Sequence, residues 1–382
     1  MKIGITTYWR GTSNYGQIVQ HWALQTVLKD MGHSPFLIRF YPGYNHGILK
    51  RWLKLLHIVD YARAIRDLLK GNSDALKRIL HDKKRDFSAF RENNLDVSKQ
   101  KYFRLSDLQH NPPMADVYVT GSDQVWSQLL SNKENEFYFL NFGSSDVRRI
   151  AYAPSFSMDA YPPELLQNLR SNLSRFYRIS CREYSGVDIC KQVGYGDAQK
   201  VLDPTLLLRK KDYLKLIKRC HVEQNQNYVF IYSLNIASPN DIRWDELKKA
   251  YKNHSFIVTP SDGYFSGKEL FGNEVVYAYS TIQGWLTDIY NSSMVVTPSF
   301  HGIALSILLE KEFVYTPLEG ACAKGNNRIL DLLTDLKLMD RVLTSERTYE
   351  QIVSKKINWS DVNKYLAELR AKSLVFLKNS LN

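Results

Sequence analysis

The feature that most constrains the fold is a succession of short apolar runs that end in small or polar residues. The first run, residues 3–8, leads through a polar turn at residues 9–16 into a segment of helical periodicity at 17–33. A second apolar run follows at residues 35–40. Strand, loop, helix and strand in this order form a βαβ unit, whose helix begins just beyond the carboxyl end of the first strand. Gly32 lies where the C-cap of that helix is expected.

Apolar runs of the same kind continue along the chain, often with a helical segment after them. Further strands are expected at residues 115–120, 149–153, 178–183, 200–205, 228–233, 255–259, 293–297 and 312–315. Short strands alternating with helices are typical of doubly wound parallel sheets, which bind ligands at the carboxyl ends of their strands. The sequence therefore predicts an α/β protein.

The length of the chain, 382 residues, favours two domains. A polar stretch near 203–212 separates two sets of strands, so we expect Rossmann-like domains at residues 1–208 and 209–355. Residues 46–105 are predicted to be a basic helical insertion in the first domain. Residues 356–382 are predicted to form a C-terminal helix, whose position at the end of the second domain would let it cross back to the N-terminal domain.

The formal net charge of +12 favours an anionic partner: nucleic acid, a membrane surface or a small substrate. Much of the excess lies between Lys50 and Arg104, a segment that contains fifteen Lys and Arg residues but only seven Asp and Glu residues. This block carries no recognisable nucleic-acid-binding module, so we expect no nucleic-acid partner. Within it, residues 48–57 form an amphipathic cationic pattern. That pattern fits either a solvated helix packed on its own domain or a helix resting on anionic lipid headgroups.

The sequence lacks the signals of several classes of protein and of binding site. No run of about 18 apolar residues predicts a spanning helix, and the N-terminus resembles a first strand more than a signal peptide. The four cysteines form no CxxC pair, which argues against zinc and fits reduced thiols in the cytoplasm. GxGxxG, P-loop and GxSxG motifs are missing from the sequence. We expect a cytoplasmic protein without a bound metal.

The strongest local signal for chemistry surrounds His301. An apolar strand is expected to end at Thr297, and a helix to begin after Gly302. His301 and Ser299 would then lie at a helix N-terminus on the ligand side of a sheet. An imidazole titrates near neutral pH, and free N–H groups at a helix N-terminus attract phosphate or carboxylate. A lone histidine is nevertheless more often structural than catalytic.

Two further motifs place arginine beside expected helix starts. Arg182 follows a strand, where its guanidinium can hold an anion bidentately; the alternative is a surface pair with Glu183. Arg328 follows a glycine-bearing loop that contains Lys324. A cation in the first turn interacts unfavourably with the helix dipole unless an anion lies nearby, so this position favours an anion-binding role for Arg328. The alternative is that Arg328 belongs to a plain solvent-facing loop.

Glycine and small polar residues follow other expected strands. Asn14 and Gly16 suit a tight turn. Gly121 with Ser122 would let the backbone approach a ligand closely. Asp123, the next residue, is a further candidate for substrate binding. The remaining candidate for substrate binding is Ser155, at the end of the strand expected at 149–153.

Seven segments in order resemble the polysaccharide pyruvyl transferase family from end to end of the chain. They are residues 14–16 with the helix that follows, 119–126, 152–156, 179–186, 201–208, 299–302 and 327–333. The resemblance implies a GT-B-like fold, in which two Rossmann-like domains face each other across a cleft. The acceptor is expected on the N-terminal side and the donor on the C-terminal side.

The resemblance also implies a reaction and its substrates. The donor would be phosphoenolpyruvate, with no cofactor, and the acceptor a hydroxyl pair on a sugar of a capsular, exopolysaccharide or cell-wall glycan precursor, often lipid-linked. The product would be a pyruvate ketal, made in the cytoplasm or at the cytoplasmic face of the membrane. A GT-B nucleotide-sugar glycosyltransferase is the alternative enzyme, and a membrane-binding module without activity is the third hypothesis.

Particular roles are implied for the motif residues. His301 would be catalytic, and Arg182, Lys324 and Arg328 would bind anions. Better-studied relatives carry Arg-Leu-His where this chain has Ser299-Phe300-His301. Either Arg328 or Lys324 takes over the contact of the missing arginine with the donor, or this branch uses a different donor or acceptor.

Overall fold

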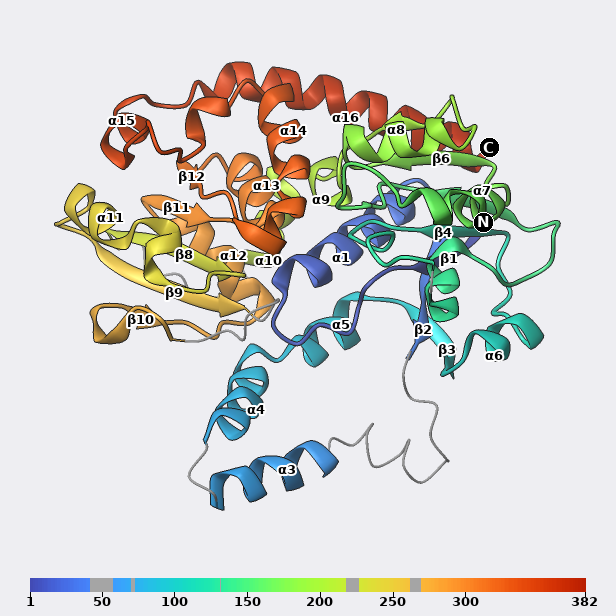
Figure 1. Ribbon diagram of the computed structural model, residues 1–382, viewed down its shortest axis with the longest axis horizontal. Helices are drawn as coiled ribbons and strands as arrows, with labels where there is room; N and C mark the ends of the chain where they lie inside the picture. The colour runs from blue at the N-terminus through green and yellow to red at the C-terminus, as the bar shows by residue number, and fades with distance from the viewer. Residues whose placement is uncertain (42–57, 70–72, 131, 218–226, 262–268) are drawn as a thin grey trace.

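Two parallel sheets organise the chain in the computed structural model, which describes residues 1–41, 58–69, 73–130, 132–217, 227–261 and 269–382 (Figure 1). The N-terminal sheet has the strand order β3-β2-β1-β4-β5-β6-β7, and the C-terminal sheet has the order β10-β9-β8-β11-β12. The N-terminal strands are β1 (Lys2–Thr6), β2 (Ser34–Phe40), β3 (Val97–Tyr102), β4 (Val117–Thr120), β5 (Arg148–Ala151), β6 (Arg178–Cys181) and β7 (Gln199–Lys200). The C-terminal strands are β8 (Tyr228–Leu234), β9 (Ser255–Ser261), β10 (Val276–Tyr277), β11 (Met294–Thr297) and β12 (Phe313–Tyr315).

Helices follow most of these strands. In the N-terminal half they are α1 (Tyr15–Asp30), α3 (Ile58–Leu69), α4 (Asp74–Arg85), α5 (Phe87–Asn94), α6 (Leu105–His110), α7 (Leu166–Leu173), α8 (Tyr184–Gln192) and α9 (Pro204–Leu207). The rest are α10 (Lys210–Ile217), α11 (Trp244–Ala250), α12 (Ile282–Asn291), α13 (Phe300–Leu308), α14 (Asn327–Asp335), α15 (Tyr349–Ser354) and α16 (Trp359–Leu381). None of the described helices combines the length and the apolarity that crossing a bilayer requires.

The strand orders determine where a ligand can bind. In each sheet the order reverses beside the first strand of that half, between β1 and β4 and between β8 and β11. Doubly wound sheets bind ligands outside the carboxyl ends of the strands at such reversal points. The loops after β1 and β4 and those after β8 and β11 therefore face the ligand side. The predicted doubly wound, GT-B-like fold is confirmed.

Three local predictions were wrong, each for a reason that the side chains supply. Of residues 200–205 only Lys200 belongs to a strand, as the last residue of β7, because Asp203 caps α9 by accepting from Thr205 N at 3.0 Å. Pro204, at the first helical position, has no N–H to leave unpaired. Helix α13 begins at Phe300, three residues earlier than expected, because the Ser299 hydroxyl accepts from Gly302 N. Asn14 is not part of a tight turn; its side chain accepts from Gln17 N and caps α1.

The insertion expected at residues 46–105 contains more than helices. Residues 97–102 form β3, which pairs in parallel with β2 at the edge of the N-terminal sheet. Helices α3, α4 and α5 account for the rest of the described insertion. The amphipathic segment expected at residues 48–57 lies outside the described residues.

The two halves share one apolar core. Helices α1 and α9 of the N-terminal half pack against α13 of the C-terminal half, and buried side chains of both halves belong to the same cluster. Tyr15 of α1 stacks on Trp285 of α12 with ring centroids 5.0 Å apart, and its hydroxyl donates to Ser280 O at 2.6 Å. The last helix, α16, spans both halves (Figure 1), and Ser373 on it accepts from Leu202 N at 2.9 Å.

A half-buried carboxyl group near the contact between the two halves should make stability depend on pH. Asp288 accepts from Ser280 Oγ at 2.9 Å, and burial raises its pKa to about 6. Because the raised pKa disfavours the ionised form, its stabilising contribution is present below the ordinary aspartate value and is lost as pH rises through about 6. Asp288→Asn should therefore be more stable than the wild type above pH 7, by at most about 3 kcal/mol. Melting curves of both proteins from pH 4.5 to 8 would test this, and parallel pH profiles would contradict it.

Candidate functional site

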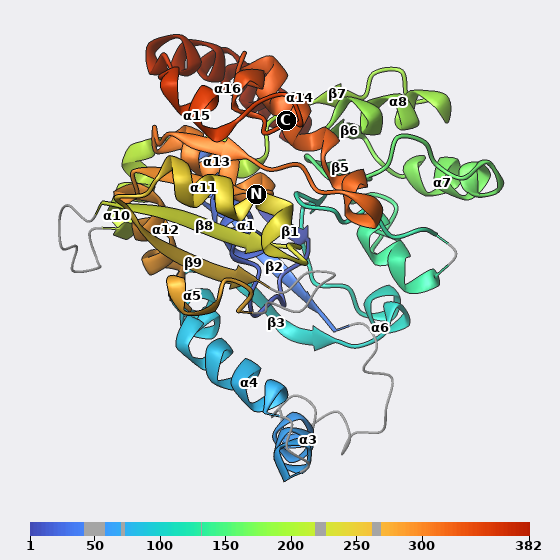
Figure 2. The ribbon, with the colours of Figure 1, turned by 60° about the vertical axis from the view of Figure 1, so that its left-hand side comes forward.

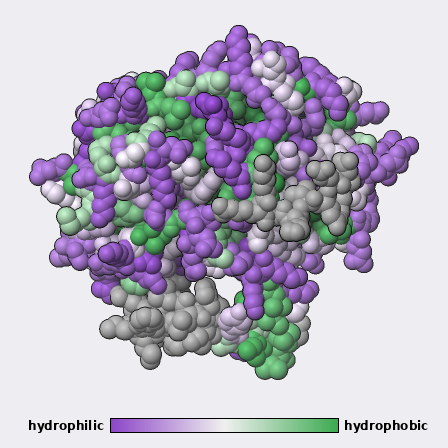
Figure 3. All heavy atoms as spheres, turned by 180° about the vertical axis from the view of Figure 1, so that it is seen from behind, coloured by the Kyte–Doolittle hydropathy of each residue, from purple (hydrophilic) through white to green (hydrophobic). Residues whose placement is uncertain are grey.

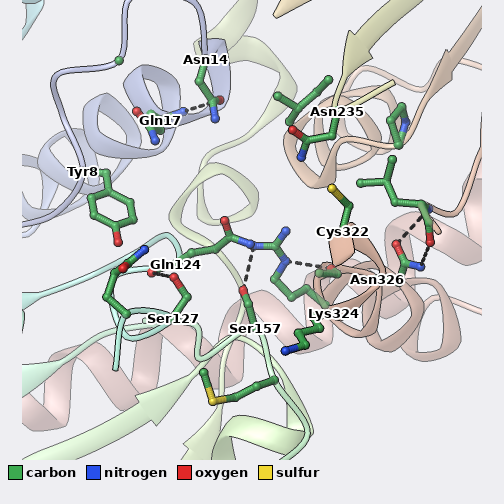
Figure 4. A pocket seen from close by; sticks show the side chains of 18 of the residues that line it. Tyr8, Asn14, Gln17, Gln124, Ser127, Ser157, Asn235, Cys322, Lys324 and Asn326 are labelled. Atoms are coloured by element: carbon green, nitrogen blue, oxygen red, sulfur yellow. Dashed lines mark hydrogen bonds between the residues drawn. The ribbon is translucent and has the colours of Figure 1, made fainter. Parts of the chain in front are cut away.

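A cleft of about 930 Å³ lies between the two halves (Figure 4). Its N-terminal wall comes from the loop after β1 with the start of α1, from the loop after β4 and from residues 157–162. Its C-terminal wall comes from residues 234–235 after β8, Pro298 after β11 and the segment 318–328. In Figure 4, Tyr8, Asn14 and Gln17 face Asn235, Cys322 and Asn326 across the cavity. The cleft thus lies at the strand ends that the topology favours.

The lining of this cleft is cationic and rich in amides. Its charged side chains are Arg10, Lys324 and Arg328, and no described Asp or Glu side chain lines it. The amide side chains are Asn14, Gln17, Gln124, Gln128, Asn235 and Asn326. Three cations without a lining carboxylate create a positive potential that attracts anions, and amides donate to and accept from hydroxyl groups.

Arg328 is held in place at the cleft wall by neighbours from both halves. Its Nε donates to Gly325 O at 3.1 Å, and its Nη1 lies 3.4 Å from Ser157 Oγ. With its amide oxygen turned toward the guanidinium, Gln124 accepts from Arg328 Nη2 at 2.9 Å. Burial, followed by the nearby charge of Arg182, lowers the pKa of Arg328 to about 10, so the group stays charged at neutral pH. The solvent-facing-loop alternative for Arg328 is therefore wrong.

A buried polar cluster centred on Asp203 adjoins the cleft. Asp203 Oδ2 accepts from Arg182 Nη1 at 3.0 Å and from Ser122 Oγ at 2.7 Å, while its Oδ1 accepts from the amide and the hydroxyl of Thr205. Burial alone would raise the pKa of Asp203, but the charges of His301 and Arg182 and the bonds from Thr205 hold it well below its usual range. The carboxylate is therefore ionised under all ordinary conditions.

His301 is wedged between Asp203 and the start of α1. Its Nε2 lies 3.6 Å from Asp203 Oδ2, and its ring faces Gly16. A Cβ atom added at Gly16 would lie 2.1 Å from Nδ1 of the imidazole, so only glycine allows the ring to occupy this position. His301 comes from the C-terminal half, whereas Gly16 and Asp203 come from the N-terminal half.

Several buried polar atoms of this cluster lack hydrogen-bond partners among the described residues. They are Arg182 Nε and Nη2, Glu183 Oε2 and His301 Nε2. Arg182 also lies over the Phe300 ring, 4.6 Å from its centroid. Arg182 and Glu183 are 2% and 0% exposed, so the alternative of a surface pair is wrong. Unpaired buried donors are costly, and their concentration beside a cleft indicates a site that binds a polar ligand.

Glu183 differs from the other carboxylates of the cluster. Its Oε1 accepts from Phe156 N at 2.8 Å, and burial raises its pKa in spite of the nearby charges of Arg182 and Arg328. A raised pKa favours the protonated carboxyl, which could donate from Oε2.

The remaining predicted residues divide into three groups. Asn14 and Lys324 line the cleft, and Ser122 and Asp123 lie at the buried cluster, where Asp123 Oδ1 is 3.7 Å from Arg182 Nη2. Ser299, Gly121 and Ser155 line no described part of the cleft. Ser299 caps α13, Gly121 has φ of 108° and would bring a Cβ to 2.2 Å from Tyr152 O, and Ser155 Oγ lies 3.0 Å from Ser157 Oγ.

Arg182 and His301 do not line the cleft directly. They are linked to it through neighbours that do: Gln124 follows Asp123, Pro298 precedes the first turn of α13, and Arg328 carries a charge that influences both Arg182 and Glu183. Asp203 and Gln124 were not among the predicted site residues. The sequence carries a signal for Asp203, because an aspartate before proline at a strand end is typical of a helix cap. It carries no comparable signal for Gln124.

The fold and this site define a class of protein. Two Rossmann-like domains that enclose a cationic, amide-lined cleft place the chain among GT-B-like proteins. The model of the polysaccharide pyruvyl transferase family matches residues 14–318, and the chain belongs to this family. It is accordingly a polysaccharide-modifying transferase. Within the described residues, no three His, Cys, Asp or Glu side chains gather as metal ligands.

Solved structures of similar overall shape have low sequence identity. The UDP-GlcNAc 2-epimerase from Neisseria meningitidis has a TM-score of 0.47 at 10% identity over 100% of this chain and 99% of its own. An α-glucosyltransferase in complex with UDP and DNA has a TM-score of 0.46 at 10% identity over 99% and 95%. The spinosyn rhamnosyltransferase SpnG has a TM-score of 0.41 at 7% identity over 100% of both chains. No curated protein matches the sequence.

Proposed function

We propose that this protein transfers the enolpyruvyl group of phosphoenolpyruvate to two hydroxyls of one sugar, forming a pyruvate ketal and releasing phosphate. The acceptor would be a glycan precursor for a capsule, an exopolysaccharide or a cell wall. The observation that carries the proposal is the cleft lined by Arg10, Lys324 and Arg328 without a described carboxylate, in a member of this family. A donor with a phosphate and a carboxylate needs such surroundings.

The cleft is large enough for two substrates with different chemistry. Lys324 and Arg328 lie on the C-terminal wall and would bind the donor anions, with Arg182 behind them. Arginine suits this task because its planar fork binds phosphate and carboxylate bidentately. On the N-terminal wall, Asn14, Gln17 and Gln128 would bind sugar hydroxyls, while Tyr8 offers a ring face to the sugar.

In the proposed reaction, the methylene carbon of phosphoenolpyruvate gains a proton while a sugar hydroxyl attacks the neighbouring carbon and loses its own. The second hydroxyl then displaces phosphate from the same carbon, and its proton leaves with the phosphate. His301 would exchange protons with the donor, and Asp203 would hold the imidazole and balance its charge. Fixed arginines would stabilise the charge that changes at the reacting carbon. For His301 to reach the donor, the cleft must close on the buried cluster or the ring must turn toward it.

A nucleotide-sugar glycosyltransferase is the second candidate, because the same three cations could hold a diphosphate. Donor-induced stabilisation separates the two candidates, since a ligand that binds only the folded state raises the melting temperature. Phosphoenolpyruvate should raise the melting temperature of this protein, whereas UDP- and GDP-sugars should not. The reverse result would favour the glycosyltransferase.

The function is tested by incubating the protein with phosphoenolpyruvate and a panel of galactosides and N-acetylhexosamines. We expect phosphate release together with one acceptor gaining a pyruvyl ketal by mass spectrometry. His301→Gln should lower turnover by about 100-fold or more, as loss of an acid–base group does, while keeping the thermal shift with phosphoenolpyruvate. Turnover near that of the wild type would refute the role of His301. Absence of ketal with every acceptor, despite sugar transfer from a nucleotide sugar, would refute the function.

A further inference from the structure

Helices α3 and α4 project from the body of the molecule (Figure 2). Both helices expose apolar side chains. Five of the thirteen large apolar side chains that are exposed in the described residues lie on these two helices. On α3 they are Tyr61, Ile65, Leu68 and Leu69, and on α4 Leu80. The four on α3 recur at helical spacing and share one face, because residues three, four and seven apart lie on the same side of a helix. Figure 3 shows hydrophobic atoms gathering at the lower end of the molecule, where α3 lies.

The apolar side chains on this face of α3 are largely exposed to solvent. Leu69 is 84% exposed and Ile65 is 54% exposed, whereas Ala64, which lies at the edge of this face beside Tyr61 and Leu68, is fully buried. Soluble proteins expose single apolar side chains commonly, but a row of them on one helix marks a surface that contacts a partner.

Cations are exposed on α4, the helix that packs against α3. Lys77, Arg78, Lys83 and Lys84 of α4 are exposed, and the described acidic residues of α4 are Asp74 and Asp82. Lysine is depleted from the cores of protein–protein interfaces, but it is enriched beside apolar residues on helices that lie in membrane surfaces. The combination therefore complements an anionic lipid surface better than another protein.

The helix pair is fixed to the C-terminal half at one end. Arg85, at the last residue of α4, donates to Pro260 O at 2.8 Å and lies over the Tyr279 ring at 5.1 Å. His81 stacks on the same ring with centroids 3.5 Å apart. These contacts hold the C-terminal end of α4 against the body of the molecule. Because α3 packs on α4, the apolar face of α3 has a fixed support.

We propose that the α3–α4 pair docks this protein on an anionic membrane surface, with the apolar face of α3 entering the headgroup region and the α4 cations contacting lipid phosphates. The occupant is the bilayer itself, and neither the donor nor the acceptor is needed for docking. The inference is therefore independent of the proposed reaction.

The test is vesicle flotation of the full chain with phosphatidylcholine vesicles and with vesicles that also contain phosphatidylglycerol. We expect binding to the anionic vesicles, weakened by salt, because screening reduces the attraction between exposed charges. The double variant Ile65→Ser/Leu69→Ser should bind at least about 10-fold more weakly, since less apolar surface enters the lipid. These side chains are exposed, so the fold should be unaffected.

The matched control is Met114→Ser/Val276→Ser, which removes apolar side chains that are 83% and 62% exposed elsewhere on the molecule. This control should bind vesicles like the wild type. Equal binding by both double variants, or no preference for anionic vesicles, would overturn the proposal. A dimer in light scattering that Ile65→Ser/Leu69→Ser dissolves, without vesicle binding by the wild type, would assign the face to a second copy of the chain instead.

Discussion

Asp203→Asn should lower the turnover for pyruvyl transfer by about 100-fold or more, although phosphoenolpyruvate should still raise the melting temperature. The substitution keeps the shape of the side chain but removes the charge that faces both Arg182 and His301. The imidazole would then have no buried carboxylate to orient it or to balance its protonated form. The effect should appear in kcat more than in the KM for the donor, and the dependence of kcat on pH should change.

Stability should fall in the same variant, because Arg182 would keep its buried charge without its nearest partner. Breaking a buried pair by removing one member costs about 3–5 kcal/mol. The pKa of Asp203 is held below its usual range, so its contribution is present above the ordinary aspartate value and is lost as pH falls through the lowered value. The variant should therefore lose less stability than the wild type on acidification.

Asp288→Asn is the control, because it makes the same change at a half-buried carboxyl group that does not line the cleft. It should keep normal turnover and an unchanged dependence of kcat on pH. If Asp203→Asn lost stability but kept both the turnover and the pH profile of the wild type, Asp203 would be only structural and its positioning role would be wrong.

Arg328→Gln should lower kcat/KM for phosphoenolpyruvate by about 100-fold or more, mainly through a higher KM. Glutamine can still contact Gly325 and Gln124, but it cannot supply the charge-assisted bidentate contact that a phosphate or carboxylate accepts from a guanidinium. The thermal shift with phosphoenolpyruvate should shrink in parallel. Initial rates at varied donor concentration would measure the effect.

A suitable control for this change is Arg370→Gln on α16. Arg370 is also half-buried, and its Nε donates to Leu206 O at 2.8 Å, as that of Arg328 donates to Gly325 O. It lies outside the cleft lining, so the KM for phosphoenolpyruvate should not change. Equal kinetic losses in both variants would point to a general structural effect and would contradict donor binding by Arg328.

Much of the fold could be predicted because its signals are local. The βαβ pattern of residues 3–40 and the apolar runs before Thr120 and Thr297 require only periodicity to be recognised. The errors occurred where side chains decide the backbone: a cap by Asp203 turned an expected strand into a helix, and the polar edge strand β3 lacks the apolar alternation of a typical strand.

The site could be predicted only in part, because the spacing of residues along the chain does not show which distant segments lie close together in the fold. Arg182 and His301 could be singled out by their positions after strands. Their common partner, Asp203, could not be paired with either from the sequence, since the three come from segments far apart in the chain. Likewise, Gly16 suggested a turn, whereas its hydrogen-only side chain in fact makes room for an imidazole of the other half.

That last contact limits how enzymes of this kind can be recombined. The imidazole belongs to one half of the chain, while the carboxylate and the glycine that accommodate it belong to the other. A chimera that borrowed its C-terminal half from a relative would carry a working histidine only if the recipient's first helix and its Asp-Pro turn matched it. The halves therefore have to be inherited, or engineered, as a compatible pair.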